Sequence, residues 1–179
     1  PMRSKISDHL NVINKNKSRT RDYYSKIISS NNLNIDWNNS FDKFYPILKE
    51  NKKMHNSKPT HSLDELYKLY DLFPNQIKLV LIKQNQNVIG GSLLFNANQR
   101  VCIIFYNMID YRFVNLQIAS IQVIESIKWA YKNNFKFLDF GISHKPDHTN
   151  PLTPKMSLIK FKEEFGSVGS LRLVFNKSL

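Results

Sequence analysis

The sequence has little cysteine, little glycine and no long hydrophobic run. One cysteine among 179 residues, Cys102, allows no disulfide within the chain, which excludes a disulfide-stapled secreted scaffold. No apolar run reaches the ~18 residues that a membrane-spanning helix needs. We also expect no signal peptide, because no short apolar segment with a basic flank opens the chain.

Several catalytic signatures are missing as well. The chain contains no G-x-S-x-G nucleophile elbow, no Walker phosphate loop and no dinucleotide-binding glycine pattern. His144, Asp147 and His148 crowd one polar loop, but Pro146 lies between them and no cysteine joins them. Because a structural metal site needs four organised ligands, we expect no metal.

What is present is typical of a globular domain with a strong positive charge. Hydrophobic residues make up 41% of the chain, which includes twelve Phe and eight Tyr. The length suits one domain with a proper core. The net charge is +12, and residues 1–60 hold 12 Lys and Arg against 5 Asp and Glu. This charge indicates either a polyanionic partner such as RNA or anionic lipid, or simply a solvated surface.

Residues 1–40 are predicted to form a basic helical lead-in. Short helical patterns occur around residues 6–13 and 21–28, and in the second of them basic residues flank Tyr23 and Tyr24. Such interleaving favours either nucleic-acid binding or a surface helix at a domain edge. The chain opens with Pro-Met, so we also expect it to be a piece of a longer protein.

Residues 41–179 are predicted to form a single α/β domain in the broad sense (α+β). We expect a mixed, mostly antiparallel sheet of five to seven strands with helices on both faces. The predicted elements are a helix over 41–53, a helix started by the Ser62-x-x-Glu65 capping box and ended by Pro74, strands at 77–84, 88–95 and 101–106, and a helix over 114–133. Gly90 and Gly91 interrupt the second strand, which indicates a bulge or a close approach by a ligand.

The most informative stretch runs from residue 136 to residue 166. A short strand is ended by Gly141, a polar loop follows, and Thr153 with Pro154 is predicted to open a helix that Gly166 ends. On this helix Lys162 projects from the buried, apolar side. Two arrangements of Lys162 are open. In the first, its aliphatic stem packs on the core and the ammonium reaches water. In the second, the cation points at Asp139 or at an anionic ligand.

The motifs LDFGIS and LIKFKEEFG in this stretch resemble the C-terminal signature of the FemABX-type transferases. Those are peptidoglycan-bridge and related enzymes on the GNAT acyltransferase fold. The upstream run NKKMHNSKPTHSLDELYKLYDLFPNQIKL is similar to members found in envelope-polysaccharide contexts, so the resemblance covers about residues 41–175. It implies transfer of an acyl or aminoacyl group to an amine of a nucleotide-linked or lipid-linked envelope precursor. It also implies a second, N-terminal subdomain outside this sequence, and a cytoplasmic location, peripheral at the inner membrane face.

The resemblance also suggests roles for individual residues. Asp139 is the candidate to orient or deprotonate the amine, and Lys162 the candidate to neutralise phosphate or oxyanion charge; the alternative is a buried ion pair between the two. His61, beside the capping box, is either a general base or a brace for its loop. The predicted substrate-binding residues are His61, Tyr106, Asn107, Arg112, Ser143 and Lys160.

The acyl donor is left open between two classes. In GNAT enzymes a glycine-rich turn equivalent to residues 107–115 holds the pyrophosphate of coenzyme A, but this turn has no glycine. Acetyl-CoA would therefore depend on Arg112, whereas aminoacyl-tRNA fits the +12 charge. The alternative function is a catalytically inactive GNAT-like module that binds RNA or a partner protein.

Overall fold

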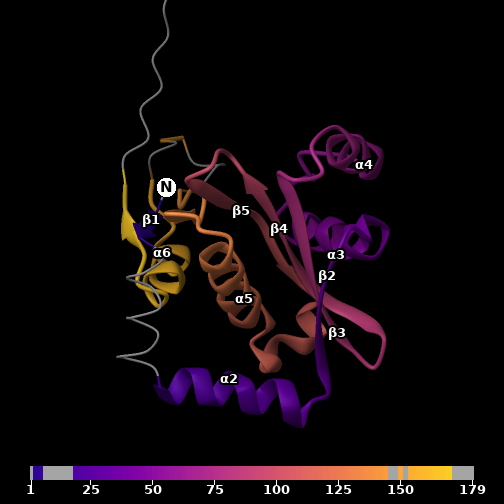
Figure 1. Ribbon diagram of the computed structural model, residues 1–179, viewed down its shortest axis with the longest axis vertical. Coiled ribbons are helices and arrows are strands. Elements are labelled where there is room, and N and C mark those ends of the chain that lie inside the picture. The colour runs from indigo at the N-terminus through magenta and orange to yellow at the C-terminus, as the bar shows by residue number, and fades with distance from the viewer. Residues whose placement is uncertain (1, 6–17, 145–148, 151–152, 171–179) are drawn as a thin grey trace, which may run out of the picture.

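The computed structural model describes residues 2–5, 18–144, 149–150 and 153–170, and it shows one seven-stranded sheet between layers of helices (Figure 1). The strands are β1 (Met2–Lys5), β2 (Leu33–Asn38), β3 (Ile77–Gln84), β4 (Asn87–Asn96), β5 (Val101–Ile109), β6 (Phe137–Asp139) and β7 (Val168–Gly169). Their order in the sheet is β2-β3-β4-β5-β6-β1-β7. All neighbours are antiparallel except β5 and β6, which are parallel. The predicted mixed, mostly antiparallel sheet is confirmed.

Helices cover both faces of the sheet, as predicted. They are α2 (Ser18–Ser30), α3 (Phe41–Met54), α4 (Leu63–Leu72), the 3-10 helix η1 (Tyr111–Leu116), α5 (Ile118–Lys132) and α6 (Met156–Glu163). Figure 1 shows α3 and α4 on one side of the sheet and α5 and α6 on the other. Each face has its own hydrophobic core, one centred on Phe41, Phe44 and Leu48 of α3 and the other on Ile118, Ile121 and Ile127 of α5. None of the described helices is long and apolar enough to cross a membrane.

The segment expected to be a helical lead-in contributes two strands to the sheet. β2 pairs along its whole length with β3, and β1 pairs with both β6 and β7. The helix predicted at 21–28 is confirmed within α2, whereas the pattern at 6–13 lies outside the described residues. In β2 every second side chain is apolar: Leu33, Ile35 and Trp37 all pack on the α5 face. This alternation is the sequence pattern that is typical of a strand. The domain boundary at residue 40 stays a prediction.

The central meander follows the predicted strands closely. β3, β4 and β5 contain the three predicted runs, and β5 continues three residues further, to Ile109. Asn85 and Gln86, between β3 and β4, both have positive φ values of 48° and 72°. Two consecutive residues with positive φ are typical of a type I′ turn, whose twist matches that of the antiparallel strands it joins.

Three of the predicted helix boundaries can be checked at their caps. The capping box of α4 is confirmed, since Glu65 N donates to Ser62 Oγ at 3.2 Å and Ser62 N donates to Glu65 Oε2 at 2.7 Å. The long helix starts later than predicted, at Ile118, because Gln117 is left-handed and the preceding turn is a 3-10 helix. The predicted start of α6 at Thr153 is wrong, because Pro154 instead forms an antiparallel bridge with His144.

The glycine pair in β4 makes room for helices on both faces of the sheet. A bulge does occur beside Gly90, where the β3–β4 register shifts. A Cβ on Gly90 would lie 2.6 Å from Ile118 Cγ2 of α5. A Cβ on Gly91 would lie 2.8 Å from Phe44 Cδ2 of α3 and 2.9 Å from Val80 O. The close approach is therefore made by the protein's own helices and by the backbone of β3.

Gly91→Ala is expected to lower the free energy of unfolding by about 1–3 kcal/mol, because the added methyl overpacks a core that cannot move away from backbone. Urea denaturation of the two proteins measures this difference. Gly169→Ala is the matched control, since a Cβ at that glycine would meet nothing within 4 Å. Equal losses in both variants would contradict the packing role of Gly91.

Candidate functional site

The parallel strands β5 and β6 separate after three paired residues. Val101, Cys102 and Ile103 pair with Phe137, Leu138 and Asp139, and within the described part of the chain the two strands pair no further. β5 continues for six more residues, to Ile109. Its edge toward β6 is therefore not covered by a described strand over residues 104–109. Backbone N–H and C=O groups need partners, so this open edge can bind an extended ligand.

A bulge in β5 changes the direction of side chains at the start of this open edge. The register shifts between Leu93, which pairs with Tyr106, and Leu94, which pairs with Ile104, so Phe105 is the extra residue. Phe105 and Tyr106 both pack on the α3 and α4 face, whereas Ile104 packs on the α5 face. The bulge thus places two consecutive aromatic rings on the same face of the sheet.

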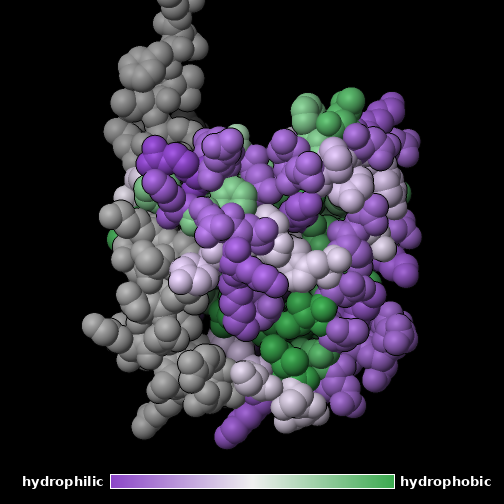
Figure 2. Space-filling model, viewed as in Figure 1, coloured by the Kyte–Doolittle hydropathy of each residue, from purple (hydrophilic) through white to green (hydrophobic). Residues whose placement is uncertain are grey.

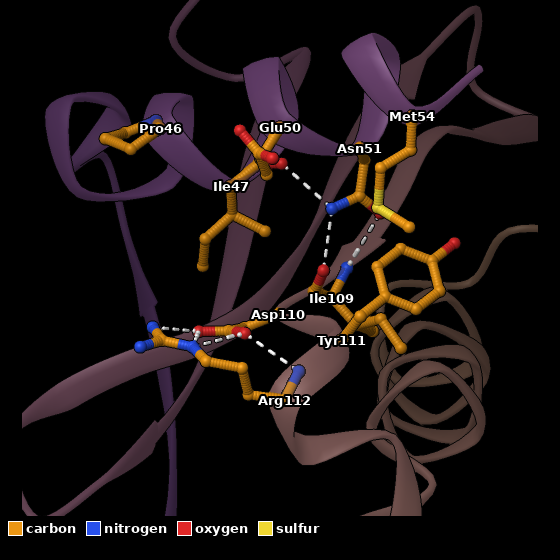
Figure 3. A pocket seen from close by; sticks show the side chains of 9 residues that line it. All are labelled: Pro46, Ile47, Glu50, Asn51, Met54, Ile109, Asp110, Tyr111 and Arg112. Carbon is orange, nitrogen blue, oxygen red and sulfur yellow. Dashed lines mark hydrogen bonds and ion pairs between the residues drawn. The ribbon is translucent and has the colours of Figure 1, made fainter.

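Asn51 of α3 closes the far end of the open edge. Its Nδ2 donates to Ile109 O at 2.6 Å, and its Oδ1 accepts from Ile109 N at 3.4 Å (Figure 3). The residue is only 5% exposed. Its amide therefore takes the place of a neighbouring strand at Ile109 and leaves residues 104–108 for any ligand. No local pattern in the sequence signals this backbone contact, because its partners lie 58 residues apart.

The turn after β6 is held by two buried side chains of opposite charge. Asp139 Oδ1 accepts from Gly141 N at 2.8 Å. Lys162 Nζ donates to Gly141 O at 3.1 Å, to Ile142 O at 2.7 Å and to Ser143 Oγ at 2.9 Å. Gly141 has a φ of 69°, which favours glycine. The turn conformation is therefore fixed from both sides, next to the point where β5 and β6 separate.

Lys162 is buried, as its place on the helix predicted. It is 5% exposed, and Asp139 is fully buried. The pKa of Lys162 is lowered from 10.5 to about 8, because burial disfavours the charged form, while the charge of Asp139 acts in the opposite direction. An ammonium group has three N–H donors, and all three are used by the turn. The geometry of Lys162 therefore suits a residue that positions the turn.

The loop that carries His61 packs on the α3 and α4 face, beside the bulge. The Tyr106 hydroxyl accepts from Thr60 N at 2.9 Å, and the ring of His61 lies 5.5 Å from that of Phe105. The Tyr45 hydroxyl donates to His61 O at 3.3 Å. The loop between α3 and α4 is thus bound to β5, and it places His61 near the open edge.

The other predicted substrate-binding residues lie in different places. Asn107 is in β5, where its amide accepts from Ser92 Oγ at 2.7 Å and donates to Ala119 O at 3.2 Å. Ser143 lies beside Lys162, and its backbone carbonyl accepts from Lys155 N at 2.9 Å. Lys160 is exposed on α6. The structure brings Ser143, Asp139 and Lys162 together, and it uses the Asn107 amide to join two strands to α5.

The carboxylate of Asp110 occupies the start of the turn that follows β5. The carboxylate of Asp110 accepts from Arg112 N at 3.0 Å and from Arg112 Nη2 at 2.6 Å. This pairing with Arg112 lowers the pKa of Asp110. Asp110 therefore already supplies an anion to the N-terminus of η1. The Arg112 side chain is 84% exposed and is bound to that carboxylate.

A pocket of about 420 Å³ opens between α3 and this turn (Figure 3). Its walls are mainly apolar, and Asn51 and the Asp110–Arg112 pair supply polar groups. The residues that line it are Pro46, Ile47, Glu50, Asn51, Met54, Ile109, Asp110, Tyr111 and Arg112. Asp139 and Lys162 are not among them, so this pocket is separate from the turn after β6.

The described residues contain no group of three or more His, Cys, Asp and Glu side chains that could hold a metal. Asp147 and His148 lie outside the described residues. Cys102 is a buried core thiol, and burial raises its pKa to about 12. A thiol with that pKa is not a nucleophile at neutral pH.

No family model and no curated protein matches this chain. Solved structures do match its fold. FemX is 12% identical with a TM-score of 0.72, and the match covers 93% of this chain and 58% of FemX. The aminoglycoside acetyltransferase meta-AAC0020 from an uncultured soil metagenomic sample, in complex with sisomicin, is 15% identical with a TM-score of 0.60 over 85% of this chain and 99% of its own.

A third match, the ribosomal-protein-alanine N-acetyltransferase from Brucella melitensis biovar Abortus 2308, is 11% identical with a TM-score of 0.59. It covers 82% of this chain and 99% of its own. At these identities the likeness concerns the fold alone. The chain has the GNAT acetyltransferase fold, which confirms the fold that the sequence predicted.

Proposed function

We propose that this GNAT-fold chain is an N-acyltransferase that moves an acyl or aminoacyl group onto an amine of a cell-envelope precursor, nucleotide-linked or lipid-linked. The observation that carries the proposal is the open edge of β5 over residues 104–108, between the bulge and Asn51. An extended donor can bind this edge through backbone hydrogen bonds, with its carbonyl held beside the separation of β5 and β6.

The reaction forms one bond and breaks one. The amine nitrogen attacks the acyl carbon to form the amide C–N bond, and the C–S bond of a thioester or the C–O bond of an aminoacyl ester breaks. The amine loses a proton, and the departing thiolate or alkoxide gains one. Positioning of the two reactants supplies much of the rate in such a transfer.

We assign Asp139 and Lys162 to positioning in this reaction. Both hold the peptide of Gly141, at the end of β6 where the two strands part. A fixed turn here sets the distance between the separating strands and so the width of the site. Ser143 is held by the same ammonium and belongs to the same group.

The observed turn after β5 favours aminoacyl-tRNA over acetyl-CoA as the donor. Asp110 takes the place of an anion there, and the chain carries a net charge of +12 that suits a polyanionic donor. The match to 58% of FemX supports a further, N-terminal subdomain in the whole protein. We place the enzyme in the cytoplasm, peripheral at the inner face of the membrane, where envelope precursors are completed.

Mass spectrometry of a transfer reaction tests the proposal. The full-length gene product is incubated with a nucleotide-linked muropeptide and either acetyl-CoA or alanyl-tRNA, and we expect a product mass increased by one alanyl residue. Affinity for tRNA should fall steeply between low and physiological salt. Binding of acetyl-CoA that weakens in Arg112→Ala but not in Arg100→Ala would instead identify coenzyme A as the donor.

The alternative is a catalytically inactive GNAT-like module that binds RNA or a partner protein. Two observations favour it, the burial of both Asp139 and Lys162 and the charge of +12. Leu72, the last residue of α4, and the following Phe73 are also 70% and 49% exposed, and Figure 2 shows hydrophobic side chains over α4 at the upper edge of this face. Salt-sensitive tRNA binding without transfer to any envelope amine would favour this module.

A further inference from the structure

The imidazole of His61 makes no hydrogen bond. Its Nδ1 atom is buried and has no partner. Buried polar atoms almost always have a partner, so such an exception needs a functional or structural reason. Nε2 also makes no hydrogen bond, but it is not among the fully buried unpartnered atoms of the described residues, and His61 as a whole is half-buried, so Nε2 keeps some contact with solvent.

The position of this ring is nevertheless fixed. Three consecutive backbone groups around it are bound, because Thr60 N donates to Tyr106 Oη at 2.9 Å, His61 O accepts from the Tyr45 hydroxyl at 3.3 Å and Ser62 N donates to Glu65 at 2.7 Å. The ring itself packs 5.5 Å from Phe105 and 6.2 Å from Phe95. Packing and backbone contacts hold the imidazole, and its own nitrogens take no part.

The unpartnered Nδ1 determines which nitrogen carries the proton in the neutral ring. Orphaned buried N–H groups are rarer in proteins than acceptors that lack a partner. This preference favours the proton on Nε2, which makes His61 a donor at the ring nitrogen that keeps contact with solvent. Its ring rests on Phe105, the bulge residue at the start of the open edge of β5.

We propose that His61 donates a hydrogen bond from Nε2 to the carbonyl oxygen of the acyl group bound at this edge. This inference rests on the proposed acyl transfer and adds a residue that contacts the reacting atoms. Negative charge grows on that oxygen when the amine attacks, so a fixed donor stabilises the transition state more than the ground state.

His61→Phe keeps the ring packing on Phe95 and Phe105 and removes only the donor. We expect its kcat for acyl transfer to fall by about 10²–10³-fold, the usual effect of removing one such donor, with a melting temperature equal to or above that of wild type, because the buried unpartnered Nδ1 is also removed. His61→Gln, which keeps an N–H donor, should recover part of the rate. The matched control is His55→Phe, an exposed histidine of the same loop, which should behave as wild type. Wild-type turnover by His61→Phe would overturn the inference.

The proton position provides a readout that does not depend on turnover. Nitrogen-15 NMR of the wild-type imidazoles at pH 8 should show the Nε2–H form of His61. An Nδ1–H form would overturn the inference even if the chain transfers acyl groups. Absence of transfer by the wild-type protein with every donor would reject the proposed acyltransferase, while the NMR result would still decide the state of His61.

Discussion

Asn51→Leu is expected to lower the free energy of unfolding by about 2–5 kcal/mol. Leucine keeps the volume but removes both partners of the Ile109 backbone, and each buried group left without a partner costs about 1–3 kcal/mol. Asn51 is 5% exposed and Ile109 is 8% exposed, so water replaces these bonds poorly. Urea denaturation monitored by circular dichroism measures the loss.

Asn133→Leu is the matched control for this experiment. Asn133 Nδ2 donates to Trp129 O, four residues earlier, at 2.8 Å, just as Asn51 Nδ2 donates to Ile47 O at 2.9 Å. Asn133 is exposed and has no contact like that of Asn51 with Ile109. The difference between the two variants therefore isolates the closure of the β5 edge. Losses of the same size would mean that Asn51 contributes only its local helix bond.

Lys162→Met is expected to remove a pH dependence from the stability of the protein. The pKa of Lys162 is about 8 in the folded chain and 10.5 when unperturbed. Between these values the unfolded state binds more protons, so the free energy of unfolding rises with pH across this window. A tenfold difference in proton affinity corresponds to about 1.4 kcal/mol. As the pH rises through the window, the free energy of unfolding of wild type should therefore increase by about 3 kcal/mol relative to that of the variant.

The sign of this effect follows from the cost of burying the ammonium. Below pH 8 both states are protonated and the folded chain carries the full cost, whereas above 10.5 neither state is charged. Lys160→Met, on the same helix but exposed, is the control and should show no such difference from wild type. If the difference in free energy of unfolding between wild type and Lys162→Met also stays constant with pH, the Lys162 ammonium is hydrated in the folded protein.

Local signals in the sequence predicted a large part of the fold. The Ser62–Glu65 capping box, the three strands of the meander and the left-handed Gly166 each depend on residues close together in the chain. The buried position of Lys162 also followed from helix periodicity alone. These features form because backbone preference and side-chain spacing act over only a few residues.

Some local signals were overridden by contacts formed in the folded chain. Thr153 and Pro154 have the chemistry of a helix start, but pairing between Pro154 and His144 delays the helix to Met156. The pattern at 114–133 is typical of one helix, yet the left-handed Gln117 separates the 3-10 turn from α5. At such boundaries tertiary contacts outweigh propensities worth less than about 1 kcal/mol per residue.

The class of sheet, most helices and many of the residues that face the core could be predicted from the sequence. The candidate site could be assigned only from the folded chain, because its main contacts join residues far apart in the sequence. Asn51 bonds to Ile109 across 58 positions, Lys162 to Gly141 across 21, and Thr60 to Tyr106 across 46. No periodicity or cap signals such a pairing, since its partners meet only when the helices pack on the sheet and β5 parts from β6.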